Sequence, residues 1–132
     1  MQRKEFLNKV QDYGGLDSTD EALQMTEIFL STLGEWLYRT EARKLAAQLP
    51  KEFQDFPFKE QDPERTRAEV AHYPLEEFYN RIKGRADVTF KDAVRIAKAV
   101  AQALKEAVSP GEIENVLEEL PDEFNELFAT QS

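Results

Sequence analysis

The chain has 132 residues, with 17 Lys and Arg against 26 Asp and Glu, so its formal net charge at pH 7 is −9. It has no Cys and one His, which excludes disulfides, thiolate zinc sites, cysteine nucleophiles and multi-histidine metal centres. The excess of carboxylates makes nucleic acid and anionic membranes poor partners. No apolar run approaches the roughly 20 residues of a transmembrane helix. We therefore expect one acidic domain over residues 1–132, located in a reducing cytoplasm, with no nucleic-acid or membrane partner.

Two helices are predicted in the first 36 residues. Apolar side chains recur at helical spacing over residues 3–13, and the pair Gly14-Gly15 ends this helix because glycine tolerates positive φ. Ser18 and Glu21 then form a capping box, in which the serine hydroxyl accepts from a helical amide and the glutamate returns to the cap amide. A long central helix follows, with apolar residues on two of its faces.

A shorter helix and a linker complete the first half. Thr40 is the expected N-cap of a helix that Leu49-Pro50 closes, because the residue before a proline is disfavoured in the α conformation. Residues 57–74 contain three prolines and alternating charges. We expect this linker to supply little of the core and to contain one short helix over residues 64–72.

The same order of helices is predicted in the second half. Ser109, Pro110 and Glu112 are typical of a helix start, with a capping serine, a proline in the first turn and a glutamate at the third position. The predicted helices run from residue 75 to 83, from residue 89 onward and from residue 109 onward.

An internal repeat accounts for this recurrence. Residues 5–10 (EFLNKV) return as residues 77–82 (EFYNRI), and residues 49–53 (LPKEF) return as residues 120–124 (LPDEF). The period is about 71 residues, longer than most solenoid repeats. No segment alternates polar and apolar residues as a strand would, so no sheet is predicted.

These patterns predict an all-α fold. It consists of two tandem pseudo-symmetric three-helix units, residues 1–56 and 75–132, packed as a compact helical bundle and joined by the linker 57–74.

Several segments resemble one bacterial family. They are residues 15–22, 32–35, 41–50, 104–114 and 120–124. Together they resemble domain of unknown function 2267 over nearly the whole chain. The resemblance implies a small, helical, mostly stand-alone protein with a duplicated unit, and it brings no established activity, substrate, cofactor or catalytic residue.

The second half has a marked charge asymmetry. Basic residues outnumber acidic ones between residues 81 and 105, whereas no Lys or Arg follows Lys105. Four of these basic residues recur at helical spacing on one side of the second long helix, which is a candidate dock for an acidic partner. The alternative is that the acidic last helix lies antiparallel to this helix and pairs with it inside the molecule. The candidate partner-binding residues are Arg81, Arg85, Lys91, Arg95, Lys98 and Lys105.

Two aromatic residues are candidates for lining a ligand pocket between the two units. Trp36 and Tyr38 stand at the end of the first long helix. The alternative for Trp36 is core packing, because tryptophan is usually at least partly buried. His72 is interpreted as a solvated loop residue or as a group that titrates near neutral pH.

These observations predict a small cytoplasmic protein-interaction or regulatory module, a monomer or weak homodimer, that docks an acidic protein partner. We expect no enzyme, no catalytic residues, no metal and no cofactor, because the sequence has no phosphate loop, nucleophile elbow or metal-ligand spacing. The alternative is a small-ligand carrier or sensor with its pocket between the two units near Trp36. Nucleic-acid binding through the helix that carries Lys91, Arg95 and Lys98 is a third class, which the net charge disfavours.

Overall fold

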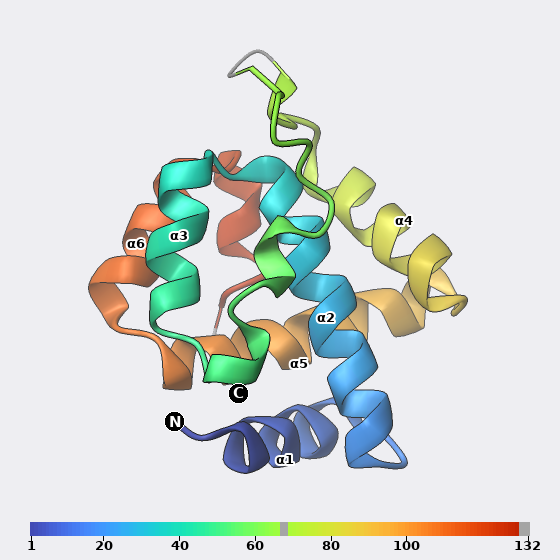
Figure 1. Cartoon of the computed structure of the whole chain (residues 1–132). Coiled ribbons are helices and arrows are strands. Elements are labelled where there is room, and N and C mark those ends of the chain that lie inside the picture. The colour runs from blue at the N-terminus through green and yellow to red at the C-terminus, as the bar shows by residue number, and fades with distance from the viewer. Residues whose placement is uncertain (67–68, 130–132) are drawn as a thin grey trace.

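The computed structural model describes residues 1–66 and 69–129. No residue in these ranges lies in a strand, and this confirms the all-α prediction (Figure 1). The α-helices are α1 (Arg3–Gly14), α2 (Thr19–Trp36), α3 (Arg39–Ala47), α4 (Leu75–Ala86), α5 (Phe90–Ala107) and α6 (Pro110–Glu118). Short 3-10 helices are η1 (Lys51–Phe53), η2 (Phe56–Phe58) and η4 (Asp122–Asn125).

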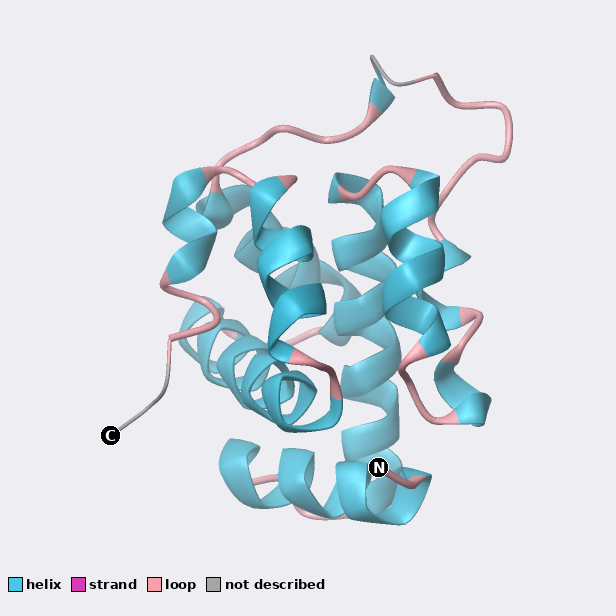
Figure 2. Ribbon diagram, turned by 90° about the vertical axis from the view of Figure 1, so that its left-hand side faces the viewer, coloured by secondary structure: helices cyan, strands magenta, loops and turns pink. Residues whose placement is uncertain are grey.

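The two long helices, α2 and α5, form the centre of the molecule (Figures 1 and 2). Helices α1 and α4 each pack against both of them, and η2 packs against α2. Helices α3 and α6 lie side by side and pack against each other. Helix lengths of 12, 18 and 9 residues occur in this order in α1–α3 and again in α4–α6. The two-repeat layout remains a prediction, which superposition of the two halves would test.

Serine and threonine caps begin three of the helices, as predicted. The Ser18 hydroxyl accepts from the amide of Glu21 at 3.1 Å, and Thr89 and Ser109 make the equivalent bonds at the starts of α5 and α6. The Glu21 carboxylate accepts a hydrogen bond from the backbone amide of Asp17, one residue before the cap, at 3.4 Å. These bonds satisfy amides that have no partner inside the helix.

The start of α3 corrects one prediction. Thr40 is not the N-cap: α3 begins at Arg39 and its N-cap is Tyr38. The Tyr38 amide donates to a carboxylate oxygen of Glu119 at 2.9 Å. The cap of α3 therefore comes from the end of α6, which no local pattern in the sequence indicates.

The ends of α1 and α4 differ in how well they were predicted. Gly15 ends α1 in the left-handed conformation with φ at 61°. Helix α4 continues three residues beyond the predicted end at Lys83 and stops at Asp87, whose φ is 56°. Aspartate tolerates this conformation better than most residues, so the end of α4 needs no glycine.

The segment 57–74 contributes more to the core than its charge suggests. Pro57, Gln61, Val70 and Ala71 are buried, whereas most of its charged residues are exposed. Of the helix predicted over residues 64–72, residues 67–68 lie outside the described residues and residues 64–66 are not helical. Residues 57 and 58 belong to η2 and Glu69 is in 3-10 conformation, whereas the other described residues of this segment cover the core without a helix.

Aromatic side chains connect the two halves in the core. The fully buried Trp36 ring contacts Phe78 of α4, with ring centroids 5.5 Å apart, and Phe124 of η4, at 6.0 Å. Phe53 is fully buried against Phe6. The rings of Trp36, Phe78 and Phe124 thus join the two halves in one core.

Two glycines inside helices give a matched test of this packing. A Cβ on Gly34 would lie 1.8 Å from the Pro57 carbonyl oxygen, whereas a Cβ on Gly84 would meet no atom within 4 Å. We expect Gly34→Ala to destabilise the fold by about 1–3 kcal/mol or more, because η2 must move away from α2. Gly84→Ala should raise stability by about 0.5–1 kcal/mol. Urea denaturation of both variants measures this contrast, and equal effects would contradict the close approach of η2 to α2.

Candidate functional site

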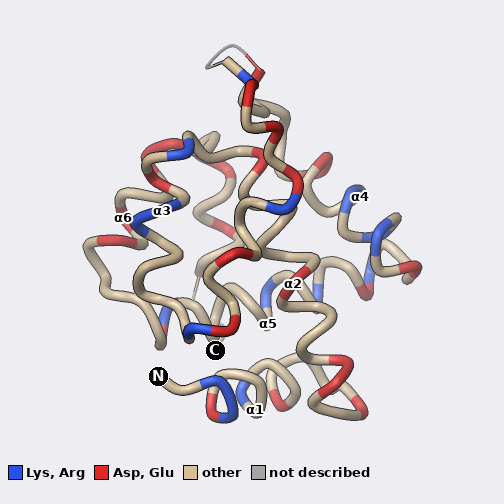
Figure 3. Tube along the Cα trace, in the orientation of Figure 1, with Lys and Arg blue, Asp and Glu red and all other residues tan. Residues whose placement is uncertain are grey.

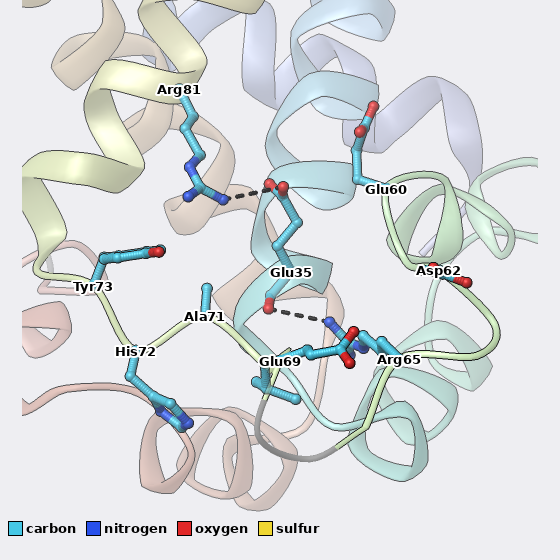
Figure 4. Close-up of a pocket in the computed structure, with 10 residues that line it drawn as sticks. Glu35, Glu60, Asp62, Arg65, Glu69, Ala71, His72, Tyr73 and Arg81 are labelled. Atoms are coloured by element: carbon cyan, nitrogen blue, oxygen red, sulfur yellow. Dashed lines mark hydrogen bonds and ion pairs between the residues drawn. The ribbon is translucent and has the colours of Figure 1, made fainter.

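The C-terminal end of α2 is where residues 61–66 and 69–73 meet the first half (Figure 4). The last carbonyls of a helix have no partner within the helix. Here the Gly34 oxygen accepts from Gln61 Nε2 at 2.7 Å, and the Glu35 oxygen accepts from the Ala71 amide at 2.9 Å and from Arg65 Nη1 at 3.2 Å. Arg65 also donates to the Leu37 oxygen. Side chains and an amide from the linker therefore cap this helix.

The Glu35 carboxylate binds two arginines of α4. Arg81 Nη1 lies 3.1 Å from Glu35 Oε1, and the two terminal nitrogens of Arg85 lie 2.7 and 3.0 Å from its two oxygens. Arg85 also donates to the Thr32 hydroxyl at 2.7 Å. The hydrogen bonds that Arg85 donates to the Glu35 carboxylate raise the pKa of Arg85. Two of the predicted partner-binding residues are therefore paired within the chain with a carboxylate of α2.

The Arg81 guanidinium also lies over two aromatic rings. Its guanidinium carbon is 5.0 Å from the centroid of the Trp36 ring and 5.1 Å from that of Tyr73. The Trp36 indole nitrogen donates to the Tyr73 carbonyl at 3.0 Å. Trp36 is fully buried, so this side chain packs in the core and fixes Arg81, as the core-packing alternative held.

A pocket of about 630 Å³ opens between the end of α2, the start of α4 and the linker. Four carboxylates and two guanidiniums contribute to its lining, and Glu35 and Arg81 already neutralise each other. We call it the Glu35 pocket. Its lining residues are Glu35, Glu60, Asp62, Arg65, Glu69, Val70, Ala71, His72, Tyr73 and Arg81. The other predicted pocket residue, Tyr38, lines a smaller neighbouring pocket of about 200 Å³.

A second pocket, of about 510 Å³, lies between α1 and α5. It is lined by Tyr13, Arg95, Lys98, Ala99 and Gln102, and we call it the α1–α5 groove. Arg95 makes only an exposed ion pair to Asp92 at 3.3 Å, and Lys98 has no ion-pair partner in the described part of the chain. The structure therefore brings together two of the predicted basic residues and adds Tyr13.

The wall of this groove is fixed by a carboxylate at the end of α5. The Tyr13 hydroxyl donates to Glu106 Oε2 at 2.7 Å, and Lys9 Nζ lies 3.0 Å from Glu106 Oε1. The hydrogen bond from Tyr13 lowers the pKa of Glu106. Sequence reasoning missed Tyr13 because nothing local relates residue 13 to a helix that starts 77 residues later.

The remaining predicted basic residues lie outside both pockets. Lys91 and Lys105 do not line the α1–α5 groove, and Figure 3 shows how the charged residues spread along α4 and α5. Helix α6 packs mainly against α3, not along α5. Intramolecular pairing therefore accounts for Arg81 and Arg85, but through Glu35 of α2 and not through the acidic last helix.

Helices α3 and α6 cap each other. The amide of Tyr38, the N-cap of α3, donates to Glu119, which is the C-cap residue of α6. The amide of Ser109, the N-cap of α6, donates to Oε1 of Gln48, the C-cap residue of α3, at 2.8 Å. Both donors and both acceptors are 71 residues apart in the sequence.

This exchange leaves two glutamates buried against each other. A glutamate at the third position of a helix ordinarily accepts from the N-cap amide, but here Gln48 and Glu119 occupy those amides. Glu41 and Glu112 are 6% and 5% exposed, and one oxygen of each has no hydrogen-bond partner among the described residues. Burial and the hydrogen bond with Glu41 raise the pKa of Glu112 to about 7. The pair therefore holds a proton at pH values where exposed carboxyls have lost theirs.

The raised pKa of Glu112 predicts that the free energy of unfolding falls as pH rises. The raised pKa means that folding takes up a proton, so the stabilisation is complete below the ordinary glutamate pKa of 4.5 and is lost as pH rises through about 7. Between pH 5 and 8 we expect wild-type stability to fall by about 1–3 kcal/mol relative to Glu112→Gln. Glu114→Gln, on an exposed residue of the same helix, is the control. Urea denaturation across this pH range that gave parallel curves for wild type and Glu112→Gln would exclude the shared proton.

Within residues 1–66 and 69–129, no group of three or more His, Asp or Glu side chains is placed to hold a metal ion. No described helix is both long enough and apolar enough to cross a membrane. The molecule is thus an all-helical domain whose polar sites consist of arginines, lysines and carboxylates. Its sequence matches the model of the uncharacterized conserved protein family DUF2267 over residues 3–127, and the chain belongs to this family. No curated protein matches it.

Proposed function

We propose that this protein is a small cytoplasmic protein-interaction or regulatory module that docks an acidic segment of a partner protein in the α1–α5 groove. The observation that carries the proposal is the placement of Arg95 and Lys98 in one groove beside an exposed tyrosine. The groove joins a helix of the first half to a helix of the second.

The chemistry of the groove is suited to a carboxylate-bearing side chain. Arg95 and Lys98 supply positive charge, and Ala99 supplies an apolar floor. Tyr13 is 45% exposed and held in place by Glu106, so its ring is a rigid wall, and aromatic residues are enriched at protein interfaces. The oxygen of the Gln102 amide is buried without a hydrogen-bond partner among the described residues, so it can accept from a backbone amide of the partner.

Because the net charge of the protein is −9, the proposal favours a short acidic segment that contacts only this groove. A long polyanion would meet the surrounding carboxylates, so we propose no nucleic-acid partner. The proposal includes a monomer or weak homodimer as the state of the free protein, because the aromatic residues that close the core are buried within one chain.

Charge reversal within the groove tests the proposal. We expect Arg95→Glu with Lys98→Glu to lose a partner that wild type retains from lysate of the source organism, because both groove cations become anions. A peptide made from the partner's acidic segment should bind wild type and weaken by at least about tenfold with the double variant, through loss of two charge-assisted contacts. The measurements are quantitative pull-down and peptide titration followed by fluorescence anisotropy.

The control has the same net charge but leaves the groove intact. Lys83→Glu with Lys91→Glu changes two exposed lysines that do not line the groove. Retention of the partner by this control, together with loss in the groove variant, supports the proposal. Equal retention by wild type and the groove variant would overturn it.

A small-ligand carrier or sensor is the second candidate function, and the Glu35 pocket is the observation that favours it. Its volume of about 630 Å³ falls within the range of ligand sites, and it lies between helices of the two halves. The polar lining would suit a small zwitterion or polyol better than an apolar molecule.

Native mass spectrometry of protein purified without denaturation tests the carrier function. We expect a bound small molecule that is lost in a variant with Glu69→Ala and His72→Ala, because both exposed side chains line the Glu35 pocket and neither forms part of the core. Glu114→Ala, outside the pocket, should leave the adduct in place. A spectrum of the bare chain alone would argue against a carrier.

A further inference from the structure

A third polar site lies where the start of α4 meets the start of α5 and η4. We call it the Tyr79 corner, and its lining residues are Pro74, Leu75, Glu76, Tyr79, Phe90, Glu123 and Glu126. Its volume is about 430 Å³. No described Lys or Arg lines it, so its charge is that of three glutamates. Two of them, Glu123 and Glu126, belong to the acidic run after Lys105, which neither candidate function uses.

Two aromatic rings form adjacent walls of this corner. The Tyr79 and Phe90 rings have centroids 5.9 Å apart and meet at 88°. Phe90 is 40% exposed although it is a large apolar residue at the first position of a helix, where a polar residue would serve equally well. Perpendicular ring faces beside carboxylates are the arrangement with which proteins bind organic cations.

The Tyr79 hydroxyl is an independent indication of a ligand. Tyr79 is 6% exposed, and its hydroxyl has no hydrogen-bond partner in the described part of the chain. A buried hydroxyl without a partner is unfavourable, and such groups in native structures call for an explanation. Burial raises the pKa of Tyr79 to about 12, so the hydroxyl stays neutral and its oxygen can accept from an ammonium N–H.

The carboxylates of the corner are available for a cation. None of the three forms an ion pair with a described residue, and Glu123 alone has a hydrogen-bond donor, the backbone amide of Leu75. Leu75 and Pro74 provide an apolar surface beside them. The site thus offers charge for a cationic head and contact area for an alkyl stem.

We propose that the Tyr79 corner binds an ammonium group on an alkyl stem, with the head between the Tyr79 and Phe90 rings and the rim glutamates. The ligand is either a free aliphatic amine or a lysine side chain, which share this chemistry.

Titration with n-butylammonium, followed by NMR of the aromatic and glutamate side chains, tests the proposal. We expect saturable shifts at Tyr79 and Phe90 that weaken as salt is added. Phe90→Ala should weaken binding by about two- to fivefold, the contribution of one exposed cation–π contact. Glu76→Gln with Glu126→Gln should also weaken it, whereas Glu114→Gln with Glu118→Gln, on exposed residues outside the corner, should not.

Tyr79→Phe separates binding from stability. Because the hydroxyl has no hydrogen-bond partner among the described residues, its removal should leave the melting temperature unchanged or raise it while weakening n-butylammonium binding. A merely structural tyrosine would give the opposite result, a lower melting temperature with unchanged binding.

A second ligand, N-acetyl-lysine methylamide, distinguishes a lysine side chain from a free amine as the source of the ammonium group. Tighter binding than that of n-butylammonium indicates a lysine side chain of a protein, whereas equal or weaker binding indicates a free amine. The proposal is overturned if n-butylammonium gives no saturable shift, if Phe90→Ala binds as wild type does, or if n-butyrate shifts the same resonances.

Discussion

The carboxyl end of α2 is the constraint on which the arrangement of the two halves depends. Its last carbonyls are bound by groups of the linker, the Glu35 carboxylate is bound by two arginines of α4, and Trp36 holds the backbone at Tyr73. Each of these contacts joins the first half to a residue beyond residue 60. These contacts hold the described linker residues Gln61, Arg65, Ala71 and Tyr73 against the end of α2, and they hold α4 against α2. The Glu35 pocket exists because these contacts hold its walls apart.

Much of the fold could be predicted because its signals are local. Apolar periodicity and capping serines and threonines place the starts of α1, α2, α4, α5 and α6 within about one residue of their observed positions. The misplaced N-cap of α3 has a physical cause. Its acceptor, Glu119, lies 81 residues away from Tyr38, and no pattern within one helix can indicate it.

The candidate site was less accessible to sequence reasoning for the same reason. Helical spacing correctly placed Arg95 and Lys98 on one side of α5, but it could not show that Tyr13 lies beside them or that Arg81 and Arg85 face Glu35. The charges of the linker suggested that it is exposed. Gln61 and Ala71 are nevertheless buried and donate hydrogen bonds to the last carbonyls of α2. A single sequence gives the side of a helix on which a residue lies, and the packing of helices decides which partner it meets.

The reciprocal caps of α3 and α6 give the molecule a property of a different kind. The side chain of the C-cap residue of each helix accepts from the N-cap amide of the other. Neither N-cap amide therefore has its acceptor until both helices are formed and in register. Folding of the two halves is thereby made cooperative, and an insertion of one residue between Tyr38 and Gln48 would disturb α6 as much as α3. A substitution at Gln48 therefore removes a hydrogen-bond acceptor from the start of a helix 61 residues further along the chain.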